Sequence, residues 1–284
     1  MKIAIIGAGI AGSIAARVLS ENGHDVSVFD DRDNFSGSRA SSNLYIASWL
    51  AKFGKPEVTR GIEILERYWG DKVDQPFSRG IADAAKIRHI AQQHLLWPPE
   101  QTIFGKIVRI EEASEGYDLF LQGSGFLRYD AVVLCCGYRA HELLALPPEM
   151  DVLVGHCALF KGKLAPGQSS ITMPLPYRHH KLYQLDEDTI YFADSTRLKM
   201  GSYSIRREEL QKKLLDAGRS AIGDPSIECK EIRIGYRPVV RGKEFGDLAH
   251  VGPRVWSMNG GGKNGLVAYA NLAGDLLEQV RSLQ

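Results

Sequence analysis

The sequence lacks any apolar run that approaches the ~20 residues needed to cross a bilayer, so no membrane partner is expected. It has only four cysteines, and these lack the spacing of metal or redox motifs. Cys135 and Cys136 are adjacent in an apolar, strand-like run, which points their side chains to opposite faces. A strand-like run already begins at Lys2, which leaves no room for a signal peptide. We therefore expect a cytoplasmic protein with reduced cysteines and no metal site.

Repeats and low-complexity linkers are also absent, and the length of 284 residues suits one large domain or two small ones. The net charge is only +1, but it is unevenly distributed. Residues 1–160 hold 16 Lys and Arg against 20 Asp and Glu, whereas residues 161–243 hold 16 against 10. The basic stretch is either an ordinary solvated surface or a surface that attracts an anionic substrate or a nucleic acid.

The first thirty residues, MKIAIIGAGIAGSIAARVLSENGHDVSVFD, predict a strand, a tight turn, a helix and a second strand. Gly7 permits the turn, Gly9 lets the backbone approach a pyrophosphate, and Gly12 lets helix and strand pack closely. The helix N-terminus offers free N–H groups and a positive dipole end to phosphates. Asp30 follows Gly12 by 18 residues, where an acid can accept hydrogen bonds from a ribose. The pattern predicts a site for a nucleotide diphosphate.

The later elements are predicted from periodicity and turn signals. Val58, Ile62, Leu65 and Trp69 lie on one face of a helix that begins near Pro56. Further helices are expected at 79–94, 204–217 and 264–283, three strand-like runs within 102–137, and an antiparallel sheet within 150–198.

The choice between NAD and FAD depends on the part of the chain beyond the first unit. A nicotinamide enzyme would continue with alternating strands and helices until a six-stranded sheet is filled. This chain instead breaks into helices after residue 43 and resumes the nucleotide fold near FLRYDAVVLCCG. That split organisation resembles FAD-binding oxidoreductases. A second G-x-G-x-x-G is absent, which argues against a built-in NAD(P)H domain, and the lack of C-x-x-C argues against a disulfide reductase.

Three further segments carry a closer resemblance: SGSRASSN at 36–43, GYRP at 235–238, and RVWSMNGGGKNGLVAYANLAGDL near the C-terminal end. Together they resemble the D-amino acid oxidase superfamily, most closely glycine oxidase and the oxidase domain of the enzymes that complete 5-methylaminomethyl-uridine in tRNA. The resemblance implies an α/β fold with a Rossmann-like FAD-binding domain and a small antiparallel-sheet substrate domain. The expected boundaries are 1–45, 79–148 and 228–284 for the first, and 46–78 and 149–227 for the second.

The resemblance also implies roles for particular residues. Arg237 would hold the substrate carboxylate, with Arg241 as the fallback, and Tyr183 or, less favoured, His179 would assist. Gly260, Gly261 and Gly262 would turn backbone N–H groups toward the C2 carbonyl of the flavin. The residues expected to act in catalysis are Arg237, Tyr183 and Lys263. The residues expected at the cofactor are Gly7, Gly9, Ile10, Ala11, Gly12, Asp30, Asp31, Arg39, Ala40, Ser41, Ser42, Ile107, Cys136, Gly137, Gly235, Arg237, Gly260, Gly261, Gly262, Lys263, Asn264, Gly265 and Leu266.

The resemblance implies noncovalent FAD and oxidation of a C–N bond in a glycine-like amino acid or amine, with hydride transfer to flavin N5 and hydrolysis of the imine. The chain is shorter than typical members of the family. This length and the basic stretch leave open a glycyl group carried on a nucleic-acid base, whose oxidation releases glyoxylate and leaves an aminomethyl base. A flavin monooxygenase is a further alternative because GDLAH at 246–250 resembles a Gly-Asp motif of those enzymes. A non-enzymatic flavin protein and an NAD-dependent dehydrogenase are less favoured.

Overall fold

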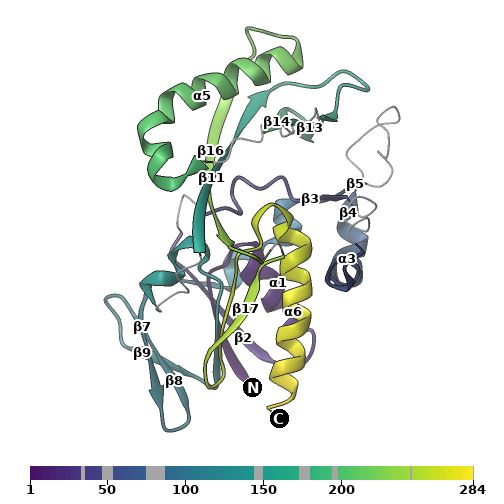
Figure 1. Ribbon diagram of the computed structural model, residues 1–284. Helices are drawn as coiled ribbons and strands as arrows, with labels where there is room; N and C mark the ends of the chain where they lie inside the picture. The colour runs from purple at the N-terminus through teal and green to yellow at the C-terminus, as the bar shows by residue number, and fades with distance from the viewer. Residues whose placement is uncertain are drawn as a thin grey trace.

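The computed structural model describes residues 1–32, 36–46, 54–74, 87–143, 150–172, 180–193, 198–243 and 245–283. Two larger sheets stand one above the other, and the long strands β11 (Met150–Lys161) and β16 (Cys229–Val240) of the upper sheet extend down toward the lower one (Figure 1). The lower sheet carries the glycine turn of residues 7–12. The upper sheet carries the region expected to bind substrate.

The lower sheet has the order β17-β18-β10-β1-β2-β6. Five strands are parallel: β1 (Lys2–Ile6), β2 (Asp25–Asp30), β6 (Thr102–Phe104), β10 (Ala131–Leu134) and β18 (Val255–Asn259). The edge strand β17 (Asp247–Gly252) is antiparallel to β18. Central strands covered on both faces read as continuous apolar runs, and β1 follows this rule. Ile3 and Ile5 join one core cluster, and Ala4 and Ile6 join the other.

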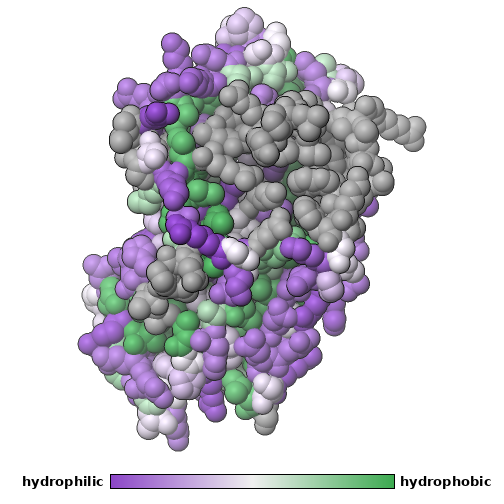
Figure 2. Space-filling view, viewed as in Figure 1, coloured by the Kyte–Doolittle hydropathy of each residue, from purple (hydrophilic) through white to green (hydrophobic). Residues whose placement is uncertain are grey.

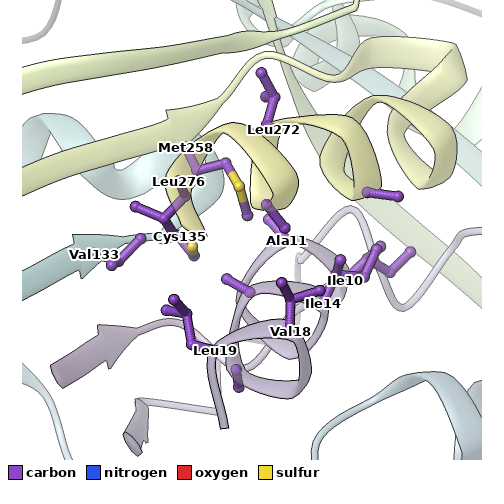
Figure 3. Packing of buried hydrophobic residues seen from close by; sticks show 14 of the residues in the cluster. Ile10, Ala11, Ile14, Val18, Leu19, Val133, Cys135, Met258, Leu272 and Leu276 are labelled. Carbon is purple, nitrogen blue, oxygen red and sulfur yellow. The ribbon is translucent and has the colours of Figure 1, made fainter. Parts of the chain in front are cut away.

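Helices α1 (Ile10–Ser20) and α6 (Gly265–Arg281) cover one face of this sheet. Figure 3 shows Ile14 and Leu19 of α1 among the apolar side chains that meet β10, β18 and α6. Helix α3 (Pro56–Trp69) packs against α6 so closely that a Cβ on Gly61 would lie 2.3 Å from the carbonyl oxygen of Val267. The other face is covered by the antiparallel strands β7 (Ile107–Ala113), β8 (Gly116–Leu121) and β9 (Phe126–Tyr129).

The upper sheet contains β12 (Ser170–Thr172), β13 (His180–Asp186), β14 (Thr189–Ala193), β11 and β15 (Leu198–Lys199), and β16 also pairs with β11. Helix α5 (Met200–Ile222) covers one face, where Leu214 and Ile222 pack on Phe160 and Phe192. Side chains on strands alternate between faces. Cys157, Tyr183 and Tyr191 therefore form a cluster on the opposite face, against Ala40 and Leu44.

A third, small sheet completes the fold: β3 (Leu44–Ile46), β5 (Ile87–Ile90) and β4 (Val73–Asp74), followed by the short helix α4 (Gln92–Leu95). Short 3₁₀ turns cover Gly70–Lys72, Pro99–Gln101, Gly137–Glu142 and Gly262–Asn264. In the described part of the chain, no helix is long and apolar enough to cross a membrane.

Several expected elements are confirmed. The first strand–helix–strand unit is present, and the helix from Pro56 buries Val58, Leu65 and Trp69 as its periodicity predicts. The helix expected at 204–217 is longer, Met200–Ile222, and ends at Gly223 with a φ of +79°. The run FLRYDAVVLCCG forms two strands, β9 and β10, which belong to different sheets and are separated at Asp130. The carboxylate of Asp130 accepts a hydrogen bond from the N–H of Lys2 at 2.6 Å.

The helix expected at 79–94 is wrong for residues 87–91. Residues 87–90 form β5, which pairs with β3 and β4, and only Gln92–Leu95 are helical. Pairing with two strands from other parts of the chain overrides the local helical pattern, because each strand supplies hydrogen-bond partners that sequence periodicity does not reveal. Residues 79–86 lie outside the described residues. The domain boundaries stay a prediction. Helix α3 was expected in the substrate domain, but it packs on α6, which covers the lower sheet.

Candidate functional site

One cavity of about 930 Å³ extends from the carboxyl ends of β1, β2 and β10 to the face of the upper sheet. This edge of a parallel sheet is where nucleotide ligands bind in open α/β folds. Most of the residues predicted from the sequence line this cavity: Gly7, Gly9, Ile10, Ala11, Asp30, Asp31, Arg39, Ala40, Ser41, Ser42, Ile107, Cys136, Gly137, Arg237, Gly262, Asn264, Gly265 and Leu266. The lining does not include Gly12, Tyr183, Gly235, Gly260 or Gly261, and the side chain of Lys263 lies outside the described residues.

The glycine turn after β1 leaves no room for side chains. Gly7 has a φ of +107°, and a Cβ there would lie 2.5 Å from the carbonyl oxygen of Cys135. A Cβ on Gly12 would lie 1.8 Å from the carbonyl oxygen of Gly7. Gly9 caps α1 without a side-chain hydrogen bond, and the Ser38 hydroxyl accepts from the N–H of Ile10 at 2.8 Å. The turn therefore brings bare backbone and a helix N-terminus to the cavity, as a pyrophosphate requires.

The end of β2 carries two of the acidic residues that line the cavity, Asp30 and Asp31. Asp30 accepts hydrogen bonds from the N–H of Ala8 at 2.8 Å and of Arg32 at 2.7 Å, so it braces the glycine turn. Asp31 pairs with Arg139, which also binds both carboxylate oxygens of Glu142 at 2.6 and 2.8 Å. Hydrogen bonds from Arg139 and then from Lys106 lower the pKa of Glu142 to about 2.

Arg237 reaches the cavity from β16, on the upper sheet. It pairs in register with Leu153 of β11, and its side chain passes over Gly155, where a Cβ would lie 2.9 Å from Nη2. Burial raises the pKa of Tyr191 well above its ordinary value and that of Tyr269 to about 12, and the positive charge of Arg237 acts on both in the opposite direction. Arg241, the fallback, instead pairs with Asp151 at 3.2 Å and does not line the cavity.

Two tyrosines occupy the face of the upper sheet, and the structure distinguishes them. Tyr183 is 1% exposed, lies outside the cavity lining and donates its hydroxyl to the carbonyl oxygen of Ser42 at 3.1 Å. Its ring stacks on Tyr191 with centroids 4.9 Å apart. Tyr191 does line the cavity and donates to the carbonyl oxygen of Ala40 at 3.1 Å. The cavity position expected for Tyr183 thus belongs to Tyr191; His179 lies outside the described residues.

The glycines before α6 use two of their three amides within the chain. The N–H of Gly260 donates to Oδ1 of Asn259 at 3.1 Å, and the N–H of Gly261 donates to the hydroxyl of Tyr269 at 3.1 Å. Of these glycines, Gly262 alone lines the cavity. Of the three glycines, only Gly262 is therefore placed for the backbone role that the sequence suggests.

Three buried polar atoms that line the cavity have no hydrogen-bond partner within the described part of the chain: Asn43 Oδ1, the Tyr45 hydroxyl and Asn264 Nδ2. Their residues are only 4%, 3% and 8% exposed. Buried polar groups are almost always hydrogen-bonded, since an unsatisfied one costs ~1–3 kcal/mol. Burial raises the pKa of Tyr45 to about 12, so its hydroxyl stays protonated and can donate. Such a set indicates a polar ligand, and the sequence had suggested only Asn264.

Comparison with known proteins supports this architecture. A family model described as an NAD(P)-binding Rossmann-like domain matches residues 5–65, whereas no curated protein matches the sequence. Iminodiacetate oxidase from Chelativorans sp. BNC1 is similar in structure, with a TM-score of 0.72 at 16% identity over 98% of this chain and 95% of that one.

Two further solved structures agree. Glycine oxidase from Geobacillus kaustophilus has a TM-score of 0.62 at 15% identity, over 98% of this chain and 94% of that one. An FAD-dependent oxidoreductase from Pseudomonas aeruginosa has a TM-score of 0.65 at 12% identity, over 99% and 90%. The chain therefore has a Rossmann-like region and shares the overall fold of these solved oxidases, which is the fold that the resemblance predicts.

Proposed function

We propose that this protein is an FAD-dependent oxidoreductase that oxidises a C–N bond of a small amino acid or amine. One observation carries the proposal: the glycine turn after β1 and the guanidinium of Arg237 line the same cavity. The turn suits a dinucleotide, and an arginine fork suits a carboxylate. A cavity with both can hold a substrate carboxylate at a fixed position relative to a bound cofactor.

The residues present fit FAD. The bare backbone of Gly7 and Gly9 and the N-terminus of α1 would hold the pyrophosphate, and the Asp30–Asp31 end would hold the adenosine. The unpartnered Nδ2 of Asn264 at the start of α6 offers a donor to a polar ring edge. Noncovalent binding is expected because no Cys or His of the sequence stands in a recognisable flavin-linkage motif. Burial also raises the pKa of the cavity residue Cys136 to about 12, which disfavours its reactive thiolate form.

When bound, FAD supplies a hydride acceptor for the carbon next to the amine nitrogen. Arg237 would hold the carboxylate of the substrate with two parallel N–H···O bonds, which fixes that carbon in position. Tyr191 lies close enough to Arg237 to feel its charge. Burial raises the pKa of Tyr191, so its hydroxyl is neutral there. A substrate that enters as the neutral amine needs no further base. Water then hydrolyses the imine to an oxo acid and an amine. The role of Lys263 stays a proposal carried by the family resemblance.

The test has two steps. Acid precipitation should release a yellow, adenine-containing cofactor; a colourless protein that binds only NAD would contradict the proposal. Anaerobic mixing with a panel from glycine and sarcosine to D-amino acids should then bleach the flavin absorbance. Arg237→Ala should retain FAD and lower kcat/KM at least ~10-fold, because a hydrogen bond to a charged group contributes ~1.5–3 kcal/mol. Arg237→Lys should recover little, since a point charge does not replace the planar fork.

A polymer-borne glycyl group is the second version of this chemistry. It is motivated by Arg206, Arg207, Lys212 and Lys213, which are exposed on α5. However, α5 packs on the face of the upper sheet opposite to Tyr191 and the cavity. Hydrophilic residues also predominate over α5 at the top of Figure 2, as on an ordinary solvated helix. The small-molecule version is therefore preferred.

Charge reversal of these four residues separates the two versions. It should leave amine oxidation unchanged if the substrate is small. If the substrate is a nucleic acid, the reversal should weaken its binding, and the binding should depend steeply on salt.

The monooxygenase alternative is less favoured for a separate reason. Asp247 of GDLAH begins β17, does not line the cavity, and is separated from α6 by β18.

A further inference from the structure

The cavity side of the upper sheet carries a second cation besides Arg237. Lys181 lies on β13, in register with Ala193 of β14, which is in register with Cys157 of β11. Since Cys157 and Tyr191 face the cavity side, the two-residue alternation of strands puts Lys181 on the same side. Lys181 lines the cavity, and its ammonium donates to the hydroxyl of Ser42 at 2.7 Å.

Arg237 and Lys181 stand on opposite sides of a floor of small residues. The strand order is β16, β11, β14, β13, so three inter-strand steps of ~4.8 Å separate the two strands. The two residues are also offset along the sheet, because Arg237 is in register with Leu153 of β11, whereas Lys181 is in register, through Ala193, with Cys157. The cavity is lined between them by Gly155 of β11 and Ala193 of β14. The guanidinium of Arg237 already extends over Gly155 toward β14. Two long cationic side chains therefore approach one small-residue floor from its two sides.

The acidic lining residues lie at the other end of the cavity. In the described part of the chain the lining carboxylates are Asp30, Asp31 and Glu142. Asp30 accepts from backbone N–H groups of the glycine turn, and Asp31 and Glu142 are held by Arg139. The field at the floor between Arg237 and Lys181 is consequently positive, and it favours a ligand with more than one negative charge.

We propose that the substrate is an amine with two carboxylates, such as an N-carboxymethyl amino acid. Arg237 binds the carboxylate beside the carbon that is oxidised, and Lys181 binds the second carboxylate across the floor of Gly155 and Ala193. This inference rests on the proposed function, because it assigns a substrate class to the same site. Lys181 is then the residue that selects a dianionic amine over a monoanionic one.

Iminodiacetate and sarcosine are the matched probes, since both are secondary amines built on glycine and only iminodiacetate has a second carboxylate. The holoenzyme should reduce its flavin with kcat/KM at least ~10-fold higher for iminodiacetate, the size expected for one charge-assisted bond. Lys181→Met should lower this ratio ~10-fold and Lys181→Arg should restore much of it. Lys163→Met, at an exposed lysine outside the cavity lining, is the control and should leave the ratio unchanged.

A binding measurement gives the same contrast without turnover. Thiodiacetate and (methylthio)acetate replace the amine nitrogen by sulfur, and calorimetry should show the larger loss of affinity for thiodiacetate in Lys181→Met. A preference of the wild type for sarcosine, or an unchanged ratio in Lys181→Met, would overturn the inference while leaving the oxidase function intact. Loosened FAD without a change in ratio would overturn it too, by assigning Lys181 to the cofactor. Failure of the whole amine panel to reduce bound FAD would overturn the function and the inference together.

Discussion

Gly155→Ala is the sharpest perturbation of the proposed carboxylate site. The added Cβ would lie 2.9 Å from Nη2 of Arg237, closer than nonbonded atoms tolerate. The contacted atom is the far end of a flexible side chain, so the guanidinium moves and the backbone does not. Gly155 is also not among the residues with positive φ, so alanine fits its backbone conformation. We expect a folded protein with a displaced Arg237.

The size of the effect depends on the bond that is disturbed. Complete loss of a charge-assisted hydrogen bond costs ~1.5–3 kcal/mol, which lowers kcat/KM about 10- to 150-fold. Arg237→Ala sets this upper limit. A shift of the guanidinium of a few tenths of an ångström or more keeps the charge and weakens the geometry, so we expect a loss of roughly 3- to 10-fold in Gly155→Ala, smaller than that of Arg237→Ala.

Steady-state kcat/KM, measured with the best amine of the anaerobic panel, is the assay. FAD content from absorbance and the thermal midpoint are the controls, and both should match the wild type. The double variant Gly155→Ala/Arg237→Ala isolates the coupling, because a methyl that acts through Arg237 costs nothing once Arg237 is gone. An equal loss from Gly155→Ala in both backgrounds would refute the reasoning, since the methyl would then act by filling the cavity.

Three further predictions test other parts of the site. Gly12→Ala should lower the thermal midpoint and abolish FAD retention, because its Cβ would lie 1.8 Å from the backbone oxygen of Gly7; Gly70→Ala, with nothing within 4 Å, should do neither. Asn264→Leu should weaken FAD binding ~2- to 10-fold in a titration of the apoprotein, yet leave the apoprotein no less stable, because it removes a buried Nδ2 that has no partner in the described part of the chain. The pKa of Glu142 is lowered to about 2 from its ordinary value near 4.5, so its stabilising effect is present above pH 4.5 and is lost as the pH falls toward 2; thermal midpoints of Glu142→Gln should lack this dependence.

The sequence was sufficient where the signal is local. The glycine turn, the apolar run of β1 and the small residues of α1 act within thirty consecutive residues, and the structure has the predicted strand, helix and strand. Helix α3 was equally readable because its apolar face repeats over four turns. The strand at residues 87–90 could not be predicted from the sequence, since it depends on pairing with β3 and β4.

The site shows the same division between local and distant causes. The spacing of the glycines at a turn is enough to predict a cofactor site. Many of the cofactor contacts predicted from the sequence therefore line the cavity. Asn43 and Tyr45 were not assigned as contacts, because their burial without partners depends on how the 36–46 segment lies against the cavity. The use of the Gly261 amide by Tyr269 likewise depends on a side-chain orientation set by the packing of α6.

Tyr183 and Tyr191 mark the limit of sequence reasoning, and they also allow a decisive experiment. They are directly paired across β13 and β14, so strand alternation puts both on the cavity side and cannot rank them. Each hydroxyl donates to a backbone oxygen at 3.1 Å, and the Tyr191 hydroxyl also interacts with the Cys157 thiol. Each Tyr→Phe variant should therefore lose at least ~1 kcal/mol of stability, a fall in thermal midpoint of ~2–4 °C or more.

The kinetic effects of the two variants should differ for a reason that is separate from stability. Tyr191 lines the cavity and lies close enough to Arg237 to feel its charge, whereas Tyr183 is stacked behind it. Tyr191→Phe should therefore reduce kcat/KM several-fold more than Tyr183→Phe, with FAD content equal in both. An equal or larger loss in Tyr183→Phe would show that the tyrosine predicted from the sequence is the one that acts, and that burial behind Tyr191 does not keep it from the substrate.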